Sequence, residues 1–185
     1  MLKRIIGFFA TVLFIGLVVG FMFVYMPYSV KQNTYQLEYI DEVERYSAEF
    51  GVDKALVYSV IKTESDFNPN AVSDAGAIGL MQIIEDSFEW VRKKLHCDEL
   101  VFEDMYSPEY SIRFGCYMLD YLYEKYESIE LTAAAYHCGM TTVDSWIEQG
   151  IIDPENVDID KIEGSKTQYY VKKILRAYDK YSELV

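Results

Sequence analysis

Apolar residues recur at helical spacing through most of the chain after residue 36. The segment before Gly51 carries them on one face as Leu37, Ile40, Val43, Tyr46 and Phe50. This spacing predicts a helix that ends at the glycine. Similar patterns predict further helices over 85–95, 108–127, 130–137, 141–149 and 167–183, joined by an acidic connection over 96–106 and a loop over 151–166. No run alternates as a strand would, so the expected fold class is all-α.

An ionisable residue occupies an apolar position in one more predicted helix. The apolar side of that helix is formed by Leu56, Val57, Val60 and Ile61. Glu64 continues the series four residues after Val60, and the helix is expected to begin at a capping Asp53 and to end near Asn68-Pro69. Burial and the negative end of the helix both raise the pKa of a carboxyl, so Glu64 is a candidate general acid. The alternative is that Glu64 lies at the rim of the core with its carboxyl group in water.

Small residues gather shortly after this helix. Gly76 and Gly79 lie three apart, beside Ala75 and Ala77, and the sequence Leu80-Met81-Gln82 follows. Glycine lets the backbone approach another backbone segment or a ligand closely. The segment therefore predicts a compact loop next to the candidate acid.

Together these residues resemble the signature of the soluble-lytic-transglycosylase-like domain, a lysozyme-related family that cleaves peptidoglycan glycan strands. The residues that carry the resemblance are Glu64-Ser65, Phe67, Pro69, Ala71, Ser73, Gly76-Ala77 and Gly79-Leu80-Met81-Gln82. Residues 134–139 resemble the family's Ala-Ala-Tyr-Asn-Ala-Gly, and residues 167–171 resemble the end of its Glu-Thr-Arg-Asn-Tyr-Val. The resemblance covers about residues 38–182 and implies a lysozyme-like helical domain.

The resemblance implies a peptidoglycan lytic transglycosylase that works without a cofactor. Glu64 would act alone as the catalytic residue at the MurNAc-β-1,4-GlcNAc bond and give 1,6-anhydromuramoyl products. The residues implied to bind substrate are Ser73, Gly79, Met81, Gln82, Tyr136, His137 and Tyr170. Two alternatives stay open, a lysozyme-like muramidase that hydrolyses the bond and a catalytically weak glycan-binding or assembly factor.

Several positions depart from the family pattern or have an ordinary structural explanation. His137 replaces the usual asparagine, and Lys166, Gln168 and Tyr169 replace Glu, Arg and Asn, which motivates the non-catalytic alternative. Ser73 and Gln82 are residue types that also hydrogen-bond loop backbone. The chain has 17 tyrosines, so Tyr136 and Tyr170 stand out only through their motifs.

The N-terminal region predicts a membrane anchor. Lys3 and Arg4 precede a stretch without charge from Ile5 to Val30, and residues 5–26 are long enough to span a bilayer. The expected organisation is a cytoplasmic stub and transmembrane helix over 1–30, a linker over 31–37 and the catalytic domain over 38–185, on the extracytoplasmic side of the cell membrane. A cleaved signal peptide is the alternative.

The net charge and the cysteines bear on which partners, disulfides and metal sites are expected. A formal net charge of −13 argues against nucleic acid as a partner, and the sequence identifies no protein partner. Cys97, Cys116 and Cys138 allow one disulfide with a spare thiol, or three thiols. No metal site is expected, because His96, Cys97, His137 and Cys138 lack the spacing typical of zinc ligands.

Overall fold

The computed structural model describes residues 12–22, 35–162 and 164–185, and the chain divides into two units, Met1–Gln36 and Leu37–Val185. In the first unit, residues 12–22 form a helix with exposed apolar side chains, such as Phe14 at 68%. Within the described ranges, no helix has both the length and the apolar character needed to cross a membrane. The predicted span over 5–26 lies partly outside these ranges, and so does most of the predicted linker.

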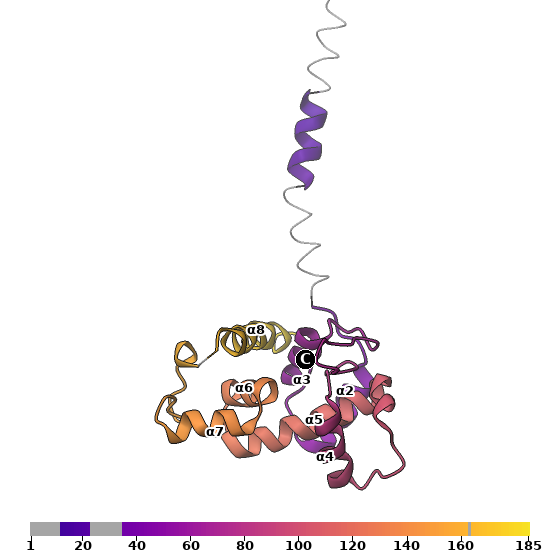
Figure 1. Cartoon of the computed structure of the whole chain (residues 1–185). Coiled ribbons are helices and arrows are strands. Elements are labelled where there is room, and N and C mark those ends of the chain that lie inside the picture. Colours follow the sequence, from indigo (N-terminus) through magenta and orange to yellow (C-terminus); the bar gives the residue numbers. More distant parts are fainter. Residues whose placement is uncertain (1–11, 23–34, 163) are drawn as a thin grey trace, which may run out of the picture. The chain divides into compact units, whose positions relative to one another are not determined.

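The second unit is built from helices (Figure 1). They are α2 (Ile40–Phe50), α3 (Lys54–Glu64), α4 (Glu85–Leu95), η1 (Phe102–Tyr106), α5 (Pro108–Tyr126), α6 (Ile129–Cys138), α7 (Met140–Glu148), η2 (Ile159–Lys161) and α8 (Ser165–Tyr181). In the described part of the chain only two isolated antiparallel bridges occur, from Val72 to Ile78 and from Ile78 to Ile83, and no strand is formed. The all-α prediction is therefore confirmed.

Local sequence signals set the two ends of α3 differently. At its start, Asp53 Oδ1 accepts a hydrogen bond of 2.8 Å from the Ala55 amide, as the predicted cap requires. At its end the helix stops at Glu64, short of the predicted end at Asn68. Asp66 and Phe67 take positive φ angles of 52° and 64°, which turn the chain so that the Phe67 side chain is buried. The early stop leaves Glu64 on the last turn of the helix.

Three smaller predictions differ from the structure. The connection over 96–106 contains η1, and the loop over 151–166 contains η2 and the first two residues of α8. Ser107 precedes α5, but its side chain makes no capping hydrogen bond. Pro108 occupies the first turn of α5, where its fixed φ favours the helical conformation, so the helix begins there without a serine cap.

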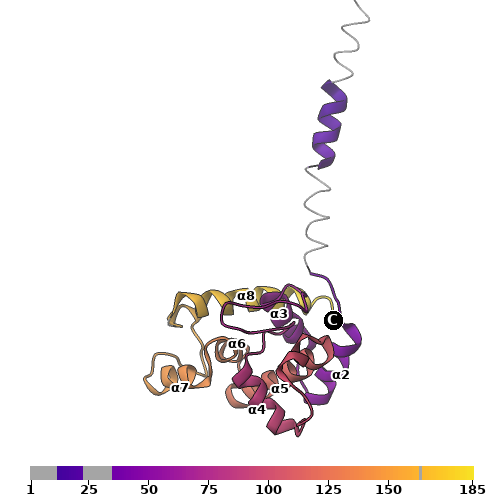
Figure 2. The same cartoon turned by 45° about the vertical axis from the view of Figure 1, so that its right-hand side comes forward.

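Helix α3 forms the centre of the unit. Every residue from Ala55 to Ile61 is buried, because α3 packs against α2, α5 and most extensively α8. The Tyr58 and Tyr181 rings stack with centroids 5.3 Å apart, and α8 lies alongside α3 in both cartoon views (Figures 1 and 2). Helix α6 also packs against α8. The core therefore brings the end of α3 next to residues of α6 and α8.

Candidate active site

Glu64 is partly buried and held by a tyrosine from another helix. The Tyr170 hydroxyl on α8 donates a hydrogen bond of 2.7 Å to Glu64 Oε1. Lys173, one turn further along α8, donates from Nζ to the Thr63 carbonyl oxygen at 3.2 Å. The Glu64 carboxyl group is thus fixed against α8 and does not simply extend into water.

The surroundings of Glu64 favour its protonated form. Burial raises the pKa of the carboxyl group above its ordinary value. The Tyr170 hydrogen bond and the positive charge of Lys173 act in the opposite direction, but the net shift is upward. A carboxylic acid with a raised pKa retains its proton closer to neutral pH and can donate it to a leaving oxygen.

Tyr136 on α6 also lies near the acid. Its hydroxyl donates a hydrogen bond of 2.8 Å to the Met81 carbonyl oxygen. Burial and then the negative charge of Glu64 raise the pKa of the Tyr136 phenol well above its ordinary value, so this hydroxyl stays protonated. Tyr136 thereby ties α6 to the loop that follows α3.

Close backbone packing holds that loop in place. Gly79 has a φ of +80°, and a Cβ atom there would lie 2.0 Å from the Met105 carbonyl oxygen. The Met81 amide donates to Ser111 Oγ at 3.1 Å, and the fully buried Met81 side chain lies against Gly115. Gly79 and Met81 therefore support the site through backbone position and packing.

Two other predicted binding residues hydrogen-bond within the loop itself. Ser73 Oγ accepts from the Ala77 amide at 3.0 Å. Gln82 donates from Nε2 to the carbonyl oxygens of Ala71 and Gly79, at 3.1 and 2.9 Å. These bonds fit the loop-stabilising alternative, although both side chains remain partly exposed.

His137 completes the group around Glu64 from the end of α6. Its ring centroid lies 4.6 Å from that of Tyr170, with an interplanar angle of 32°. Its Nδ1 lies 3.1 Å from Thr167 Oγ1, within hydrogen-bonding distance. Burial and the charge of Lys166 lower the pKa of the imidazole, so the ring is mostly neutral at pH 7.

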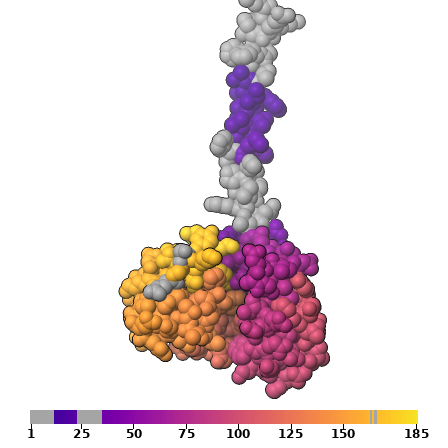
Figure 3. All heavy atoms as spheres, in the orientation of Figure 1, coloured from indigo at the N-terminus to yellow at the C-terminus, as the bar shows by residue number. Residues whose placement is uncertain are grey.

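A groove of about 450 Å³ opens beside Tyr136 and His137. It is lined by Ile84, Asp86, Ser87, Trp90, Met118, Leu122, Ala135, Tyr136, His137, Cys138, Gly139 and Met140. The lining thus comes from the start of α4, from α5 and from the α6–α7 junction. In the space-filling view, α6 to α8 in orange and yellow lie beside the magenta segments before α5 (Figure 3).

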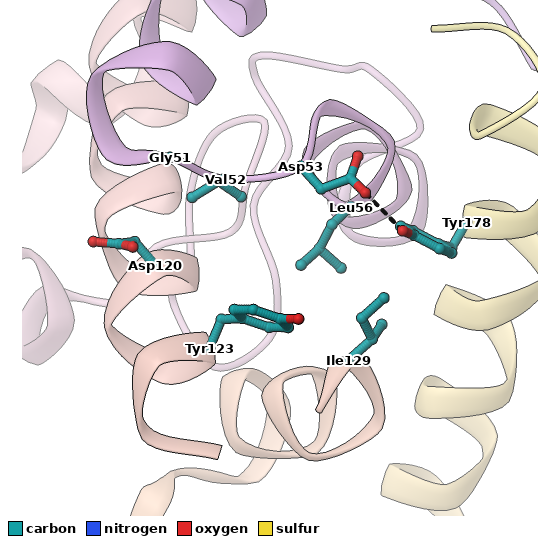
Figure 4. Close-up of a pocket in the computed structure, with 8 residues that line it drawn as sticks. All are labelled: Gly51, Val52, Asp53, Leu56, Asp120, Tyr123, Ile129 and Tyr178. Atoms are coloured by element: carbon teal, nitrogen blue, oxygen red, sulfur yellow. Dashed lines mark hydrogen bonds between the residues drawn. The ribbon is translucent and has the colours of Figure 1, made fainter. Parts of the chain in front are cut away.

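A smaller cavity of about 140 Å³ lies at the other end of α3. Figure 4 shows Tyr178 directed toward Asp53, to which it donates a hydrogen bond of 2.6 Å, with Leu56 and Ile129 nearby. An α-helix rises about 1.5 Å per residue, so roughly 15 Å of α3 separates this cavity from Glu64. The cavity is therefore separate from the candidate site.

Three aspartates that follow Glu64 in the sequence face water. Asp66 is exposed and forms an ion pair with Lys62, and both Asp74 and Asp86 are exposed. All three cysteines are free thiols, with Cys97 and Cys116 buried. Among the residues described, no cluster of histidine, cysteine and acidic side chains is arranged to hold a metal ion.

Three supporting residues were not identified from the sequence as part of the site. Ser111, Thr167 and Lys173 contact Met81, His137 and the end of α3, respectively. Lys173 lies three residues after Tyr170, so helical spacing alone would have placed both on one side of α8. No comparable signal exists for the pairing of Ser111 with Met81, because it depends on how α5 meets the loop.

Sequence comparisons with known proteins point to one family. A family model described as "Transglycosylase SLT domain" matches residues 41–156. The soluble lytic murein transglycosylase of Escherichia coli K12 is 29% identical over 154 residues, which cover 81% of this chain and 24% of that protein. The membrane-bound lytic murein transglycosylase C of Sodalis glossinidius is 46% identical over 50 residues, 27% of this chain and 14% of that protein.

Solved structures of soluble lytic transglycosylases have a similar fold. The 70 kDa soluble lytic transglycosylase from Escherichia coli superposes with a TM-score of 0.72 at 28% identity, over 80% of this chain and 24% of that one. A complex of a 70 kDa soluble lytic transglycosylase with bulgecin A gives a TM-score of 0.74 at 27% identity, over 81% and 25%. This chain thus spans about a quarter of the length of these larger proteins.

Proposed function

The chain belongs to the transglycosylase SLT domain family, and on this basis we propose that it is a lytic transglycosylase acting on peptidoglycan glycan strands. The observation that carries the proposal is the partly buried Glu64 carboxyl group, which has a raised pKa and accepts a hydrogen bond from Tyr170. The names of the relatives, which are lytic murein transglycosylases, support the same reaction class.

In the proposed reaction, Glu64 acts first as an acid and then as a base. Protonated Glu64 gives its proton to the oxygen of the MurNAc-β-1,4-GlcNAc bond, and the bond from the MurNAc C1 to that oxygen breaks with assistance from the N-acetyl group. The Glu64 carboxylate then takes the proton of the MurNAc 6-hydroxyl, and O6 bonds to C1. The products are a 1,6-anhydromuramoyl end and a free GlcNAc 4-hydroxyl, and Glu64 is protonated again.

The surroundings of Glu64 favour this single-acid route over one that uses two carboxylates. An inverting or retaining hydrolase places a second carboxylate at the cleavage point. Asp66 is engaged by Lys62, and neither Asp74 nor Asp86 is among the groups that shift the pKa of Glu64, although Asp86 lines the groove. Lys173 and the phenol of Tyr170 are the groups that act on the Glu64 carboxyl group. We place the glycan along the groove between α4, α5 and the α6–α7 junction, with its reacting end near Tyr136.

Cleavage of purified peptidoglycan, followed by mass spectrometry, tests the proposal. The wild type is expected to clear a cell-wall gel and to release products with anhydro ends. Glu64→Gln should lower the rate about 10²–10⁴-fold, because the amide has no proton to donate. Asp66→Asn, at an exposed carboxylate two residues away, is the matched control and should stay active. Products with only reducing ends would indicate a muramidase. Equal clearing by wild type and Glu64→Gln would show that Glu64 is not the acid, and no clearing by either would favour a non-catalytic glycan-binding factor.

We also propose that residues 5–26 anchor the chain in the cell membrane, with residues 38–185 on the extracytoplasmic side. The support is the uncharged stretch from Ile5 to Val30 after Lys3 and Arg4. Full-length protein should stay in the membrane pellet after alkaline carbonate extraction, and protease added outside spheroplasts should digest the domain. Release into the supernatant with loss of the first residues would instead identify a cleaved signal peptide.

A further inference from the structure

His137 contacts α8 in two ways. One face of the imidazole lies against the Tyr170 ring, with centroids 4.6 Å apart, and Nδ1 on the ring edge lies 3.1 Å from Thr167 Oγ1. Thr167 and Tyr170 are three residues apart on one side of α8, so the ring spans one helical turn. Both are nearly buried, at 6% and 7% exposure, and they form a fixed surface under His137.

The Tyr170 ring connects this contact to the acid. The hydroxyl of the same tyrosine donates the 2.7 Å hydrogen bond to Glu64 Oε1. A phenol hydroxyl moves with its ring, so a side chain that fixes the ring plane also fixes the direction of this hydrogen bond. His137 is therefore connected to Glu64 through a single intermediate residue.

We propose that His137 is a positioning residue that holds Tyr170 in its hydrogen bond to Glu64, an inference that rests on the proposed function. It replaces the expectation that His137 acts chiefly by binding substrate. Histidine stands here where the family usually has asparagine, whose amide cannot present a comparable aromatic face. His137 is exposed and lines the groove, and its ring also lies against the buried Tyr170 ring.

The charged groups around His137 favour a neutral imidazole, which is the form that this positioning role requires. Lys166 and Tyr170 face it from α8, Cys138 follows it on α6, and Asp86 of α4 lines the same groove. Burial and Lys166 keep the imidazole mostly uncharged at pH 7. A neutral ring stacks on Tyr170 without adding a positive charge near Glu64, which would lower the pKa of the acid.

A double-mutant cycle between His137→Ala and Tyr170→Phe tests the inference, with the Glu64 pKa measured by NMR on carboxyl-labelled protein. This readout requires no turnover, so it stays informative even if the proposed function fails. Loss of a hydrogen bond to the ionised carboxyl group raises its pKa. Both single variants are therefore expected to raise the Glu64 pKa, and the double variant should match Tyr170→Phe alone. In kinetics, His137→Ala should lower kcat about 10- to 100-fold with little change in KM.

His137→Phe is the second variant, because it keeps an aromatic face against Tyr170. It should retain most of the wild-type kcat and Glu64 pKa, and its melting temperature checks the fold. Three results would overturn the inference: an unchanged Glu64 pKa in His137→Ala, a mainly raised KM that persists in the Tyr170→Phe background, or His137→Phe as impaired as His137→Ala. The second of these would identify His137 as a direct substrate contact.

Discussion

The Tyr170 hydroxyl lies 2.7 Å from Glu64 Oε1, although 106 positions separate the two residues in the sequence. Tyr170 is on α8 and Glu64 ends α3, so the hydrogen bond exists only because these two helices pack side by side. Burial raises the pKa of the Glu64 carboxyl group more than this bond and Lys173 lower it. The packing of α3 on α8 therefore sets the pH range in which the acid holds its proton.

Lys173→Met is expected to extend activity to higher pH. The Lys173 charge lowers the pKa of Glu64, so its removal leaves that pKa higher. A general acid works while protonated, so the alkaline limb of the kcat/KM profile should move upward, and the difference should shrink at high ionic strength. Lys172→Met is the matched control, because Lys172 pairs with Asp160 instead. An equal shift in both variants would show that net charge, and not Lys173 itself, tunes the acid.

Glu64→Gln is expected to raise stability at pH 7 while it removes activity. A raised folded-state pKa means that the folded protein binds the Glu64 proton more tightly than the unfolded chain does. The free energy of unfolding therefore falls as pH rises from the ordinary glutamate pKa of about 4.3 through the raised value. Glutamine has no proton to lose, and its side-chain oxygen can still accept from Tyr170.

Thermal melting at several pH values checks this prediction. The melting temperatures of wild type and Glu64→Gln should agree within error well below pH 4, where both side chains are uncharged. They should diverge as pH rises, with the variant more stable at pH 7. A variant that is less stable at pH 7 would mean that the ionised carboxylate stabilises the fold, contrary to the direction of its pKa shift.

Periodicity in the sequence identified most of the helices and the acid. The bounds of α4 match the predicted 85–95 segment, and Ile112, Cys116 and Leu119 are buried in α5 as their spacing predicts. Glu64 does lie at the end of an otherwise buried helical face. These features depend on neighbours within a few residues, which a sequence pattern records directly.

The arrangement around the acid depends on packing that local patterns do not record. Met81 was expected to contact substrate, yet its side chain fills the space left by Gly115 on α5. Gln82 adopts a positive φ of 50°, and its side-chain amide donates to the Ala71 carbonyl oxygen within the loop. The early end of α3 likewise depends on the burial of Phe67.

Gly79→Ala is expected to destabilise the domain far more than Gly76→Ala. Both glycines have a φ of +80°, which costs an alanine about 1–2 kcal/mol. A Cβ atom at Gly79 would also lie 2.0 Å from the Met105 carbonyl oxygen, whereas nothing lies within 4 Å at Gly76. Because the clashing atom is backbone, we expect a loss above about 3 kcal/mol for Gly79→Ala. Denaturant unfolding measures both, and equal losses would show that the loop moves away from Met105 at little cost.

Trp90→Ala is expected to weaken the cleavage of long glycan strands more than that of short ones. Trp90 lines the groove and contacts Tyr117 and Tyr121, with ring centroids 5.6 and 4.9 Å apart. A fixed indole ring offers an apolar face on which a sugar ring can stack.

The KM for long strands should rise about 3- to 10-fold, with kcat nearly unchanged, because Trp90 would bind the strand away from the reacting bond. Fragments too short to reach Trp90 should be cleaved at the wild-type rate. Tyr123→Ala is the control, because Tyr123 is an exposed aromatic residue of α5 that lines the separate cavity at the start of α3. A Trp90→Ala effect independent of strand length, or matched by Tyr123→Ala, would place the glycan outside this groove.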